Sequence, residues 1–247
     1  MTGSPPVPQQ DPALTALARV AADEVEEGML VGLGTGSTAE ALVRELGRRV
    51  AEGLRILGVP TSQRTAALAR SLGIRVRTLD DVLKSGDTIH VGLDGADEID
   101  PALNATKGRG GALLFEKLVA VSCARFVLIA GEAKLVTRLG SRMPVPVEVV
   151  ALGWAGTLAR LEALGLHPRL RLTAALMEAP AISFRTDSQN LIIDCATGAL
   201  ADSAATALAI KSTTGVVDHG LFLGIAHAAY IAGTDGTVRQ LLPAVAR

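Results

Sequence analysis

The sequence predicts an α/β protein in which a parallel sheet, covered by helices on both faces, is accompanied by a smaller α+β domain. Up to residue 130, apolar strand-like runs alternate with segments of helical periodicity, the order found in parallel sheets. After MPVPVEVV at 143–150 the expected order becomes β-α-β-β-α-β, which is the ferredoxin-like arrangement. We therefore expect a main domain at 1–142 and 220–247, with a disordered tail at 1–10, and a second domain at 143–219.

The first half of the chain shows this alternation element by element. A helix should begin at Asp11, because an acid in the capping position followed by Pro12 is typical of a helix start. Apolar residues then recur with helical spacing as far as Val25. Further on, the sequence predicts strands at 29–34, 55–60, 74–79, 88–93 and 125–130, and helices at 37–50, 61–73 and from about 111 onward.

The second half has different periodicity and more prolines. Here the sequence predicts strands at 145–150, 181–186, 190–196 and 215–219, and helices at 153–165 and 202–212. Two last apolar segments, AAYIAG and GTVRQLL, read as strands that return to the first domain.

Composition excludes several classes of protein. Of the 247 residues, 49% are hydrophobic and the mean hydropathy is +0.36, so extended disorder is not expected. Aromatic residues make up 2% and the net charge is −1, which argues against nucleic acid or an acidic membrane surface as a partner. With no membrane-length apolar run and no signal-peptide pattern, we expect a cytoplasmic protein. Cys123 and Cys195 lie in apolar stretches and should be free thiols.

A glycine-rich loop, GLGTGST at 32–38, follows one predicted strand and opens a helix. Backbone N–H groups and the helix dipole can hold an anion at such a place, and Thr35, Ser37 and Thr38 add hydroxyl donors. The loop lacks the lysine of a Walker motif, has Ser37 where a dinucleotide motif has its third glycine, and is followed by no acid about 20 residues on. A small phosphorylated metabolite is therefore favoured over NAD. The alternative is a purely structural turn.

An acidic loop, DGADEID at 94–100, follows another predicted strand. Ligands of open α/β sheets bind at the carboxyl ends of the strands, so Asp94 and Asp97 could move sugar hydroxyl protons or bind Mg²⁺. Lys107, close by in the sequence, weakens the metal hypothesis because a cation could neutralise the same carboxylates. We expect Glu98 and Asp100 to be solvated or to cap a helix. The alternative for the whole loop is a solvated turn.

A third loop, in KGRGGALLFEK at 107–117, brings a lysine and glycines before an apolar helix that carries Glu116. On such a helix Glu116 would be partly enclosed by apolar neighbours, including Leu113, Leu118 and Val121, and its pKa should rise toward the range of a general base. The alternative is an ordinary exposed helix residue. The three loops should meet at one edge of the sheet.

Four motifs, VGLGTGSTA, HVGLDGADEID, KGRGGALLFEK and GVVDHGLF, make the sequence similar to the type A family of ribose-5-phosphate isomerases from about residue 14 to 242. The resemblance implies a Rossmann-like main domain, a ferredoxin-like lid domain, and a homodimer or homotetramer. It also implies an aldose–ketose isomerase that interconverts D-ribose 5-phosphate and D-ribulose 5-phosphate through a cis-enediolate, in the non-oxidative pentose phosphate pathway, without cofactor or metal.

The resemblance also implies roles for single residues. Glu116 corresponds to the family's proton-transferring glutamate, Asp94 and Asp97 would assist ring opening, and Lys107 would stabilise negative charge. The implied substrate-binding residues are Thr35, Gly36, Ser37, Thr38, Asp94, Gly95, Ala96, Asp97, Lys107, Gly108, Arg109, Gly110 and Lys134.

This sequence departs from the family pattern at a few positions, and other readings stay open. Arg109 stands where a glycine is common, and Phe115 stands where arginine is frequent, which we expect to make the surroundings of Glu116 more apolar. A sugar-phosphate-binding regulatory module, a sugar-phosphate deaminase and a CoA transferase are the alternatives. The presence of Glu116 after the KGRGG loop disfavours all three.

Overall fold

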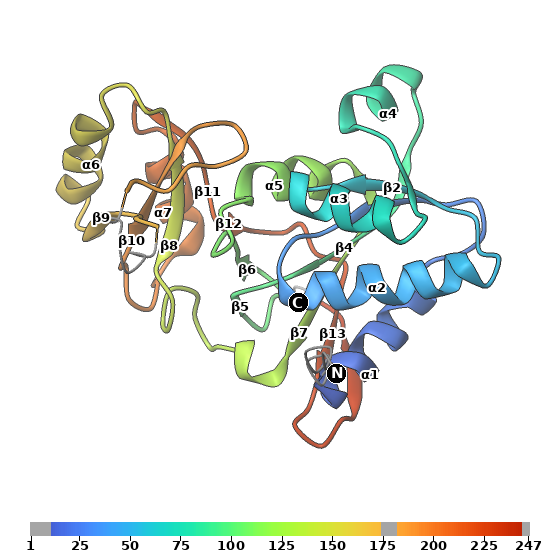
Figure 1. The fold of residues 1–247 in the computed structure, drawn as a ribbon. Helices are drawn as coiled ribbons and strands as arrows, with labels where there is room; N and C mark the ends of the chain where they lie inside the picture. The colour runs from blue at the N-terminus through green and yellow to red at the C-terminus, as the bar shows by residue number, and fades with distance from the viewer. Residues whose placement is uncertain (1–10, 174–181, 244–247) are drawn as a thin grey trace, which may run out of the picture.

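A computed structural model of the protein describes residues 11–173 and 182–243 (Figure 1). The main sheet has seven strands in the order β14-β13-β7-β4-β1-β2-β3, and all neighbours are parallel except β13 and β14. The six parallel strands, numbered along the chain, lie in the order 3-2-1-4-5-6, which is that of Rossmann-like folds. The strands are β1 (Leu30–Leu33), β2 (Leu57–Pro60), β3 (Arg75–Val76), β4 (Ile89–Gly95), β7 (Cys123–Gly131), β13 (Ala228–Ala232) and β14 (Val238–Leu241). The predicted parallel sheet and its two returning strands are confirmed.

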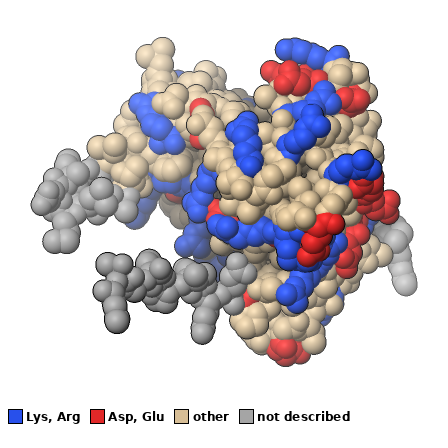
Figure 2. Space-filling model, turned by 45° about the vertical axis from the view of Figure 1, so that its right-hand side comes forward, with Lys and Arg blue, Asp and Glu red and all other residues tan. Residues whose placement is uncertain are grey.

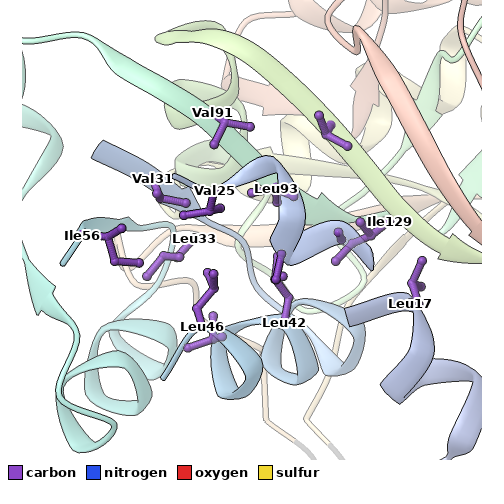
Figure 3. Close-up of a cluster of buried hydrophobic side chains, with 14 of the residues drawn as sticks. Leu17, Val25, Val31, Leu33, Leu42, Leu46, Ile56, Val91, Leu93 and Ile129 are labelled. Atoms are coloured by element: carbon purple, nitrogen blue, oxygen red, sulfur yellow. The ribbon is translucent and has the colours of Figure 1, made fainter. Parts of the chain in front are cut away.

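One face of this sheet is covered by α1 (Pro12–Ala21) and α2 (Ser37–Ala51), with α3 (Gln63–Ser71) beside α2 (Figure 1). Asp11 caps α1 as predicted, because its side chain accepts a hydrogen bond from the Ala13 N–H at 2.9 Å. The core on this side consists of apolar side chains from the two helices and the central strands (Figure 3): Leu17, Leu42, Leu46, Val31, Leu33, Val91, Leu93 and Ile129.

The opposite face is covered by α5 (Leu113–Val121), which approaches the strands closely because two glycines leave room. A Cβ atom at Gly32 would lie 2.8 Å from the Val119 side chain, and one at Gly92 would lie 2.5 Å from the Cys123 sulfur. Neither separation is possible for real side chains, so glycine in β1 and β4 lets Val119 pack directly on the sheet.

The third predicted strand, 74–79, is wrong in length. Only Arg75–Val76 form β3, and the unpredicted helix α4 (Leu79–Ser85) follows. Thr78 caps this helix, since its hydroxyl oxygen accepts a hydrogen bond from the Asp81 N–H at 3.1 Å. Thr78 and Asp81 are spaced as in a capping box. This helix-start signal is present in the sequence, but we assigned residues 74–79 to a strand because of their apolar residues.

A second, four-stranded antiparallel sheet has the order β11-β8-β10-β9. We call these four strands the lid sheet. Their order along the chain, 4-1-3-2, and the helices after the first and third strands are those of a ferredoxin-like unit. Its elements are β8 (Val145–Val149), α6 (Trp154–Ala163), β9 (Pro168–Leu170), β10 (Leu191–Cys195), α7 (Ser203–Lys211) and β11 (Val216–His219).

The second strand of this sheet is not where the sequence placed it. We predicted 181–186, whereas β9 lies at 168–170, and 182–186 makes only isolated bridges at Ser183 and Arg185. Residue 181 lies outside the described residues, as does the predicted tail at 1–10. The domain boundaries at 142 and 220 stay a prediction.

A third, unpredicted sheet joins short strands from distant parts of the chain. It consists of β5 (Glu98–Ile99), β6 (Ala105–Thr106) and β12 (Leu221–Phe222). Lys107 directly follows β6, and its N–H donates a hydrogen bond to the Gly220 carbonyl oxygen at 2.8 Å. This sheet therefore anchors the loop that begins at Lys107.

The surface carries mixed charges. On the face drawn in Figure 2, blue Lys and Arg side chains lie among red Asp and Glu side chains, in keeping with the net charge of −1. Within the described part of the chain, none of the helices has the length and apolar character needed to cross a membrane.

Candidate active site

The carboxyl ends of β1 and β4, where the strand order reverses, border a cavity of about 320 Å³. Ligands of doubly wound sheets bind at this switch point. The cavity is lined by Thr35, Gly36, Ser37, Thr38, Gly95, Ala96, Asp97, Lys107, Gly108, Arg109, Gly110, Glu116 and Lys134. The structure thus brings together all the residues that were predicted to be catalytic or to bind substrate, except that Asp94 is not part of the cavity lining.

The loop at 35–38 presents the start of α2 to the cavity. Gly36, with φ of 107°, precedes the helix, and the exposed Ser37 is its first residue. The Thr35 side chain is fixed by hydrogen bonds within the protein, because its hydroxyl lies 2.8 Å from the hydroxyl groups of Thr61 and Ser62. Ser37 and the helix N-terminus are therefore open to an anion, while the Thr35 side chain already has partners.

Asp94 is buried, with 1% of its surface exposed, and orders its neighbours. Its Oδ1 accepts hydrogen bonds from the Thr35 N–H at 3.1 Å and from its own neighbour Gly95 at 2.7 Å. Its Oδ2 lies 3.0 Å from Lys107 Nζ. A Cβ atom at Gly34 would lie 2.2 Å from this carboxyl group, so only glycine lets the first loop approach so closely.

Lys107 lies between two carboxyl groups, those of Asp94 and Glu116. It is 2% exposed, donates to the Gly95 carbonyl oxygen at 2.6 Å, and lies 3.4 Å from Glu116 Oε2. Burial lowers the pKa of Lys107, but the charges of Asp94 and Glu116 outweigh it and raise that pKa overall. Lys107 is therefore an ammonium ion at neutral pH.

Glu116 is 4% exposed and faces the cavity. Burial, the largest cause, raises the pKa of Glu116 to about 8; Lys107 opposes the shift, and Asp94 and Asp97 add to it. Its Oε2 makes no hydrogen bond to any described residue. A buried carboxyl group on a cavity wall with a pKa near neutrality has the properties of a general base.

The enclosure of Glu116 differs from the one that the sequence suggested. Leu118 and Val121 are 44% and 62% exposed, so they do not cover the carboxyl group. Instead, Val119 packs on the sheet and the Lys117 ammonium lies 2.7 Å from Asp218 Oδ1 on β11. These two contacts fix the rotation of α5. Phe115 lines a separate apolar cavity rather than the one containing Glu116, so its effect on the surroundings of Glu116 stays a prediction.

The remaining predicted residues lie on the open side of the cavity. Asp97 is half-buried, and its Oδ2 accepts a hydrogen bond from the Arg109 N–H at 3.0 Å. The Arg109 side chain is exposed. Lys134 lies on a short 3-10 helix after β7 (Glu132–Lys134) and lines the cavity from the opposite loop.

Glu98, which we expected to be solvated or to cap a helix, is buried at 1% exposure. Its Oε1 accepts from the Arg142 N–H at 2.6 Å, and its Oε2 accepts from the Gly140 N–H, also at 2.6 Å. It therefore fixes the chain that leads into the lid sheet. Asp100 accepts from the Ala102 and Asn104 N–H groups, both at 2.9 Å, and so orders a turn rather than a helix end.

Fold and site together define an α/β protein of the enzyme-like, doubly wound class, with a cavity at the switch point of its sheet and a buried carboxyl group on the cavity wall. The sequence model of a family described as Ribose 5-phosphate isomerase A (phosphoriboisomerase A) matches residues 57–236. Ribose-5-phosphate isomerase A of Roseiflexus castenholzii is 52% identical over 232 residues, covering 93% of this chain and 95% of the relative. That of Synechococcus sp. is 51% identical over 229 residues, covering 91% and 96%.

Solved structures agree with this. Ribose 5-phosphate isomerase from Plasmodium falciparum superposes with a TM-score of 0.85 at 37% identity, covering 94% of this chain and 99% of that chain. A D-ribose-5-phosphate isomerase in complex with phospho-erythronic acid gives 0.84 at 33% identity, covering 93% and 97%. The chain belongs to the ribose 5-phosphate isomerase A family, and it is an isomerase that interconverts ribose 5-phosphate and ribulose 5-phosphate.

Proposed function

We propose that Glu116 is the base that carries a proton between C2 and C1 of the open-chain sugar phosphate. The observation that supports this most directly is a buried carboxyl group on the cavity wall whose pKa burial raises to about 8. In its ionised form Glu116 takes the C2 proton, and the C2–H electron pair forms the C1–C2 double bond of a cis-enediolate. The charge moves to the aldehyde oxygen. Glu116 then returns the proton to C1 while the O2 proton passes to O1, which gives the ketose.

Lys107 stabilises the negative charge on the former carbonyl oxygen. Its ammonium group is already held 3.0 Å from Asp94 and 3.4 Å from Glu116 before substrate enters. A cation fixed in a dry site needs no reorganisation during the reaction, and such fixed charges are usually the largest catalytic contribution. Asp94 acts on Lys107 and on the Thr35 N–H from behind the cavity wall.

Asp97 assists ring opening and the hydroxyl proton movements, because it is the one of the two aspartates that lines the cavity. The substrate phosphate binds at the N-terminus of α2, where Ser37 and Thr38 supply hydroxyl donors and the helix dipole favours an anion. Lys134 adds an ionic contact across the cavity. The backbone of Gly95, Ala96, Gly108 and Gly110 surrounds the rest of the sugar.

The test is isomerisation of ribose 5-phosphate in D₂O, followed by NMR. The wild-type protein should form ribulose 5-phosphate with deuterium at C1, since a carboxyl proton exchanges with solvent. Glu116→Gln should lose about 10²–10⁴-fold in kcat, the usual contribution of a general base, whereas Glu26→Gln on the exposed surface should be unaffected. Near-normal turnover in Glu116→Gln would remove Glu116 from the mechanism.

We also propose that the protein acts in the cytoplasm, within the non-oxidative pentose phosphate pathway, as a homodimer or homotetramer. The reaction and the family resemblance support the pathway and the assembly, and the near-neutral net charge of −1 supports the expectation that nucleic acid is not a partner. Light scattering after size-exclusion chromatography would measure the assembly directly. A 25.4 kDa particle would contradict it.

A further inference from the structure

One arginine connects the lid sheet to the loop that begins at Lys107. Arg171, just after β9, donates from Nη1 to the carbonyl oxygens of Gly108 and Arg109, at 2.9 and 3.0 Å. These are the only side-chain hydrogen bonds that the described residues give to those two carbonyl groups. The contact spans more than 60 residues of sequence and joins the end of β9 in the lid sheet to the loop that follows β6.

Arg171 is held in place by a second residue of the same sheet. Its Nε lies 2.8 Å from Asp194 Oδ2, and its Nη2 donates to Asp194 Oδ1, so the guanidinium fork engages the carboxylate with two bonds. The ring of Phe184 lies 5.8 Å from the guanidinium carbon. The side chains of Arg171 and Asp194 are 14% and 22% exposed. A partly buried bidentate pair of this kind is rigid, and its remaining N–H groups point in a fixed direction.

The two bonds from Arg171 fix which way the peptide groups of this loop face, and the Gly111 N–H adds a backbone hydrogen bond to the Gly108 carbonyl oxygen at 3.0 Å, so the Arg109 carbonyl depends on Arg171 more than the Gly108 carbonyl does. In a trans peptide the N–H points away from the C=O, and no described peptide bond is cis. The Arg109 N–H, opposite the Gly108 carbonyl, donates to Asp97 at 3.0 Å. The Gly110 N–H, opposite the Arg109 carbonyl, points away from Arg171, has no acceptor among the described residues, and belongs to a residue that lines the cavity. That N–H is available to an oxygen of the substrate.

We propose that Arg171, oriented by Asp194, is a positioning residue that holds the 108–110 peptides so that the Gly110 N–H donates to the negatively charged oxygen of the enediolate. The lid sheet thereby contributes to charge stabilisation without touching the substrate. A donor aimed at developing charge acts mainly in the transition state. Loss of Arg171 should therefore lower kcat and leave KM nearly unchanged. This inference rests on the proposed function of the 107–110 loop in charge stabilisation.

The experiment compares Arg171→Ala with Arg169→Ala. Arg169 lies two residues away on β9, is opposite Asp194 in the strand register and is exposed. Arg169→Ala therefore removes one guanidinium group from the same strand without removing the hydrogen bonds to the 108–109 carbonyl groups. We expect kcat of Arg171→Ala to fall at least about tenfold, because loss of an oxyanion donor costs about 10²–10³-fold and a misplaced donor costs less. KM should stay within about threefold, Arg171→Lys should recover part of kcat, and Arg169→Ala should match the wild type.

Binding of phospho-erythronic acid supplies a readout that a purely structural effect would not move. Its carboxylate carries negative charge where the enediolate does, so Arg171→Ala should weaken its binding by about the same factor as kcat, while inhibition by inorganic phosphate should not change. Equal kcat in Arg171→Ala and Arg169→Ala overturns the proposal. A rise in KM with unchanged kcat also overturns it.

Two further comparisons keep the test decisive. If Arg171→Ala does not fold, as judged by its thermal melting, Asp194→Asn is measured instead; it keeps Arg171 but removes the charge that orients it, and should also lower kcat selectively. Full activity in Glu116→Gln with a loss in Arg171→Ala would refute the proposed base and leave the Arg171 pair standing. A loss of activity in Glu116→Gln with full activity in Arg171→Ala would refute the role of the Arg171–Asp194 pair and leave the proposed base standing.

Discussion

The two ends of the cavity are built in opposite ways. The reactive end consists of Asp94, Lys107 and Glu116, which are exposed by 1%, 2% and 4%. The open end consists of Ser37, Thr38 and Lys134, of which Ser37 is exposed and the other two are half-buried. Charges at the reactive end are paired and dry before any substrate arrives. Groups at the open end face water.

The difference fits the roles that we propose for the two ends, charge stabilisation at the reactive end and phosphate binding at the open end. A phosphate group carries its charge throughout the reaction, so hydroxyls and a solvated ammonium are enough to hold it, and salt will weaken these contacts. The charge of an enediolate exists only briefly and must be met by groups that are already in place. Substitutions at the reactive end should therefore change kcat, and substitutions at the open end should change KM.

The largest effect should follow Lys107→Met. Without the ammonium, two buried carboxyl groups lose their shared counter-ion, and at least one of them must take up a proton. We expect kcat to fall by about 10²–10³-fold through loss of charge stabilisation. Stability should drop by about 3–5 kcal/mol, as for other broken buried pairs. Steady-state kinetics and urea unfolding measure the two effects.

Lys84→Met is the matched control, because Lys84 lies on α4 and is exposed. It should leave both quantities unchanged. If Lys107→Met kept its kcat and lost only affinity, the reactive end would behave like the open end, and the contrast between them would be lost.

The next effect concerns pH and the stability of the reactive end. The pKa of Glu116 is about 8 in the folded chain against an ordinary value of 4.5, so between these pH values the folded state keeps a proton that the unfolded state has released. Stability from this group is therefore full below pH 4.5 and is lost as pH rises through about 8. Glu116→Gln has no titrating carboxyl group at this position, so its stability does not contain this pH-dependent contribution.

Glu116→Gln should accordingly become more stable relative to the wild type as pH increases from 5 to 9, by an amount on the order of a few kcal/mol. Thermal melting of both proteins across this range measures the difference. Parallel curves would show that the buried carboxyl group does not titrate in this interval.

A smaller effect should appear at the open end. Ser37→Ala removes one neutral donor to a charged phosphate, a type of bond that contributes about 1.5–3 kcal/mol, so KM should rise by about tenfold or more while kcat changes little. Thr213→Ala is a suitable control, because Thr213 is partly exposed and, among the residues that the structure describes, its hydroxyl bonds only the Ala209 carbonyl oxygen. An equal loss of kcat and kcat/KM in Ser37→Ala would mean that this end also acts in the transition state.

The sequence was sufficient for the features that depend on near neighbours. The turns after β1 and β4 and the helix that carries Glu116 were predictable because glycines, caps and apolar periodicity act over a few residues. Their meeting at one edge followed from parallel-sheet topology. The raised pKa of Glu116 was expected in direction, although the residues that enclose it were partly misassigned.

What the sequence could not give depends on contacts between distant segments. Glu98 read as a solvated acid because the N–H groups that it binds lie more than 40 residues away. Strand β9 has only three residues, too few for a periodic signal. The Arg171–Asp194 pair joins β9 and β10 and then reaches the 108–109 peptides, and no local pattern marks it.

The smallest effect should be that of Lys134→Ala, which tests how far the open end depends on solvated charge. Lys134 is half-buried, and no salt bridge is formed by it within the described residues. An exposed ionic contact contributes about 0.2–1 kcal/mol, so KM at low salt should rise by less than about fivefold, with kcat unchanged. Because the Debye length shortens from about 30 Å at 0.01 M to about 10 Å at 0.1 M salt, the ratio of the two KM values should approach one as salt is added. Lys107→Met should show no such convergence, since its charges are shielded from solvent. A salt-independent ratio for Lys134→Ala would place this lysine with the reactive end rather than with the open end.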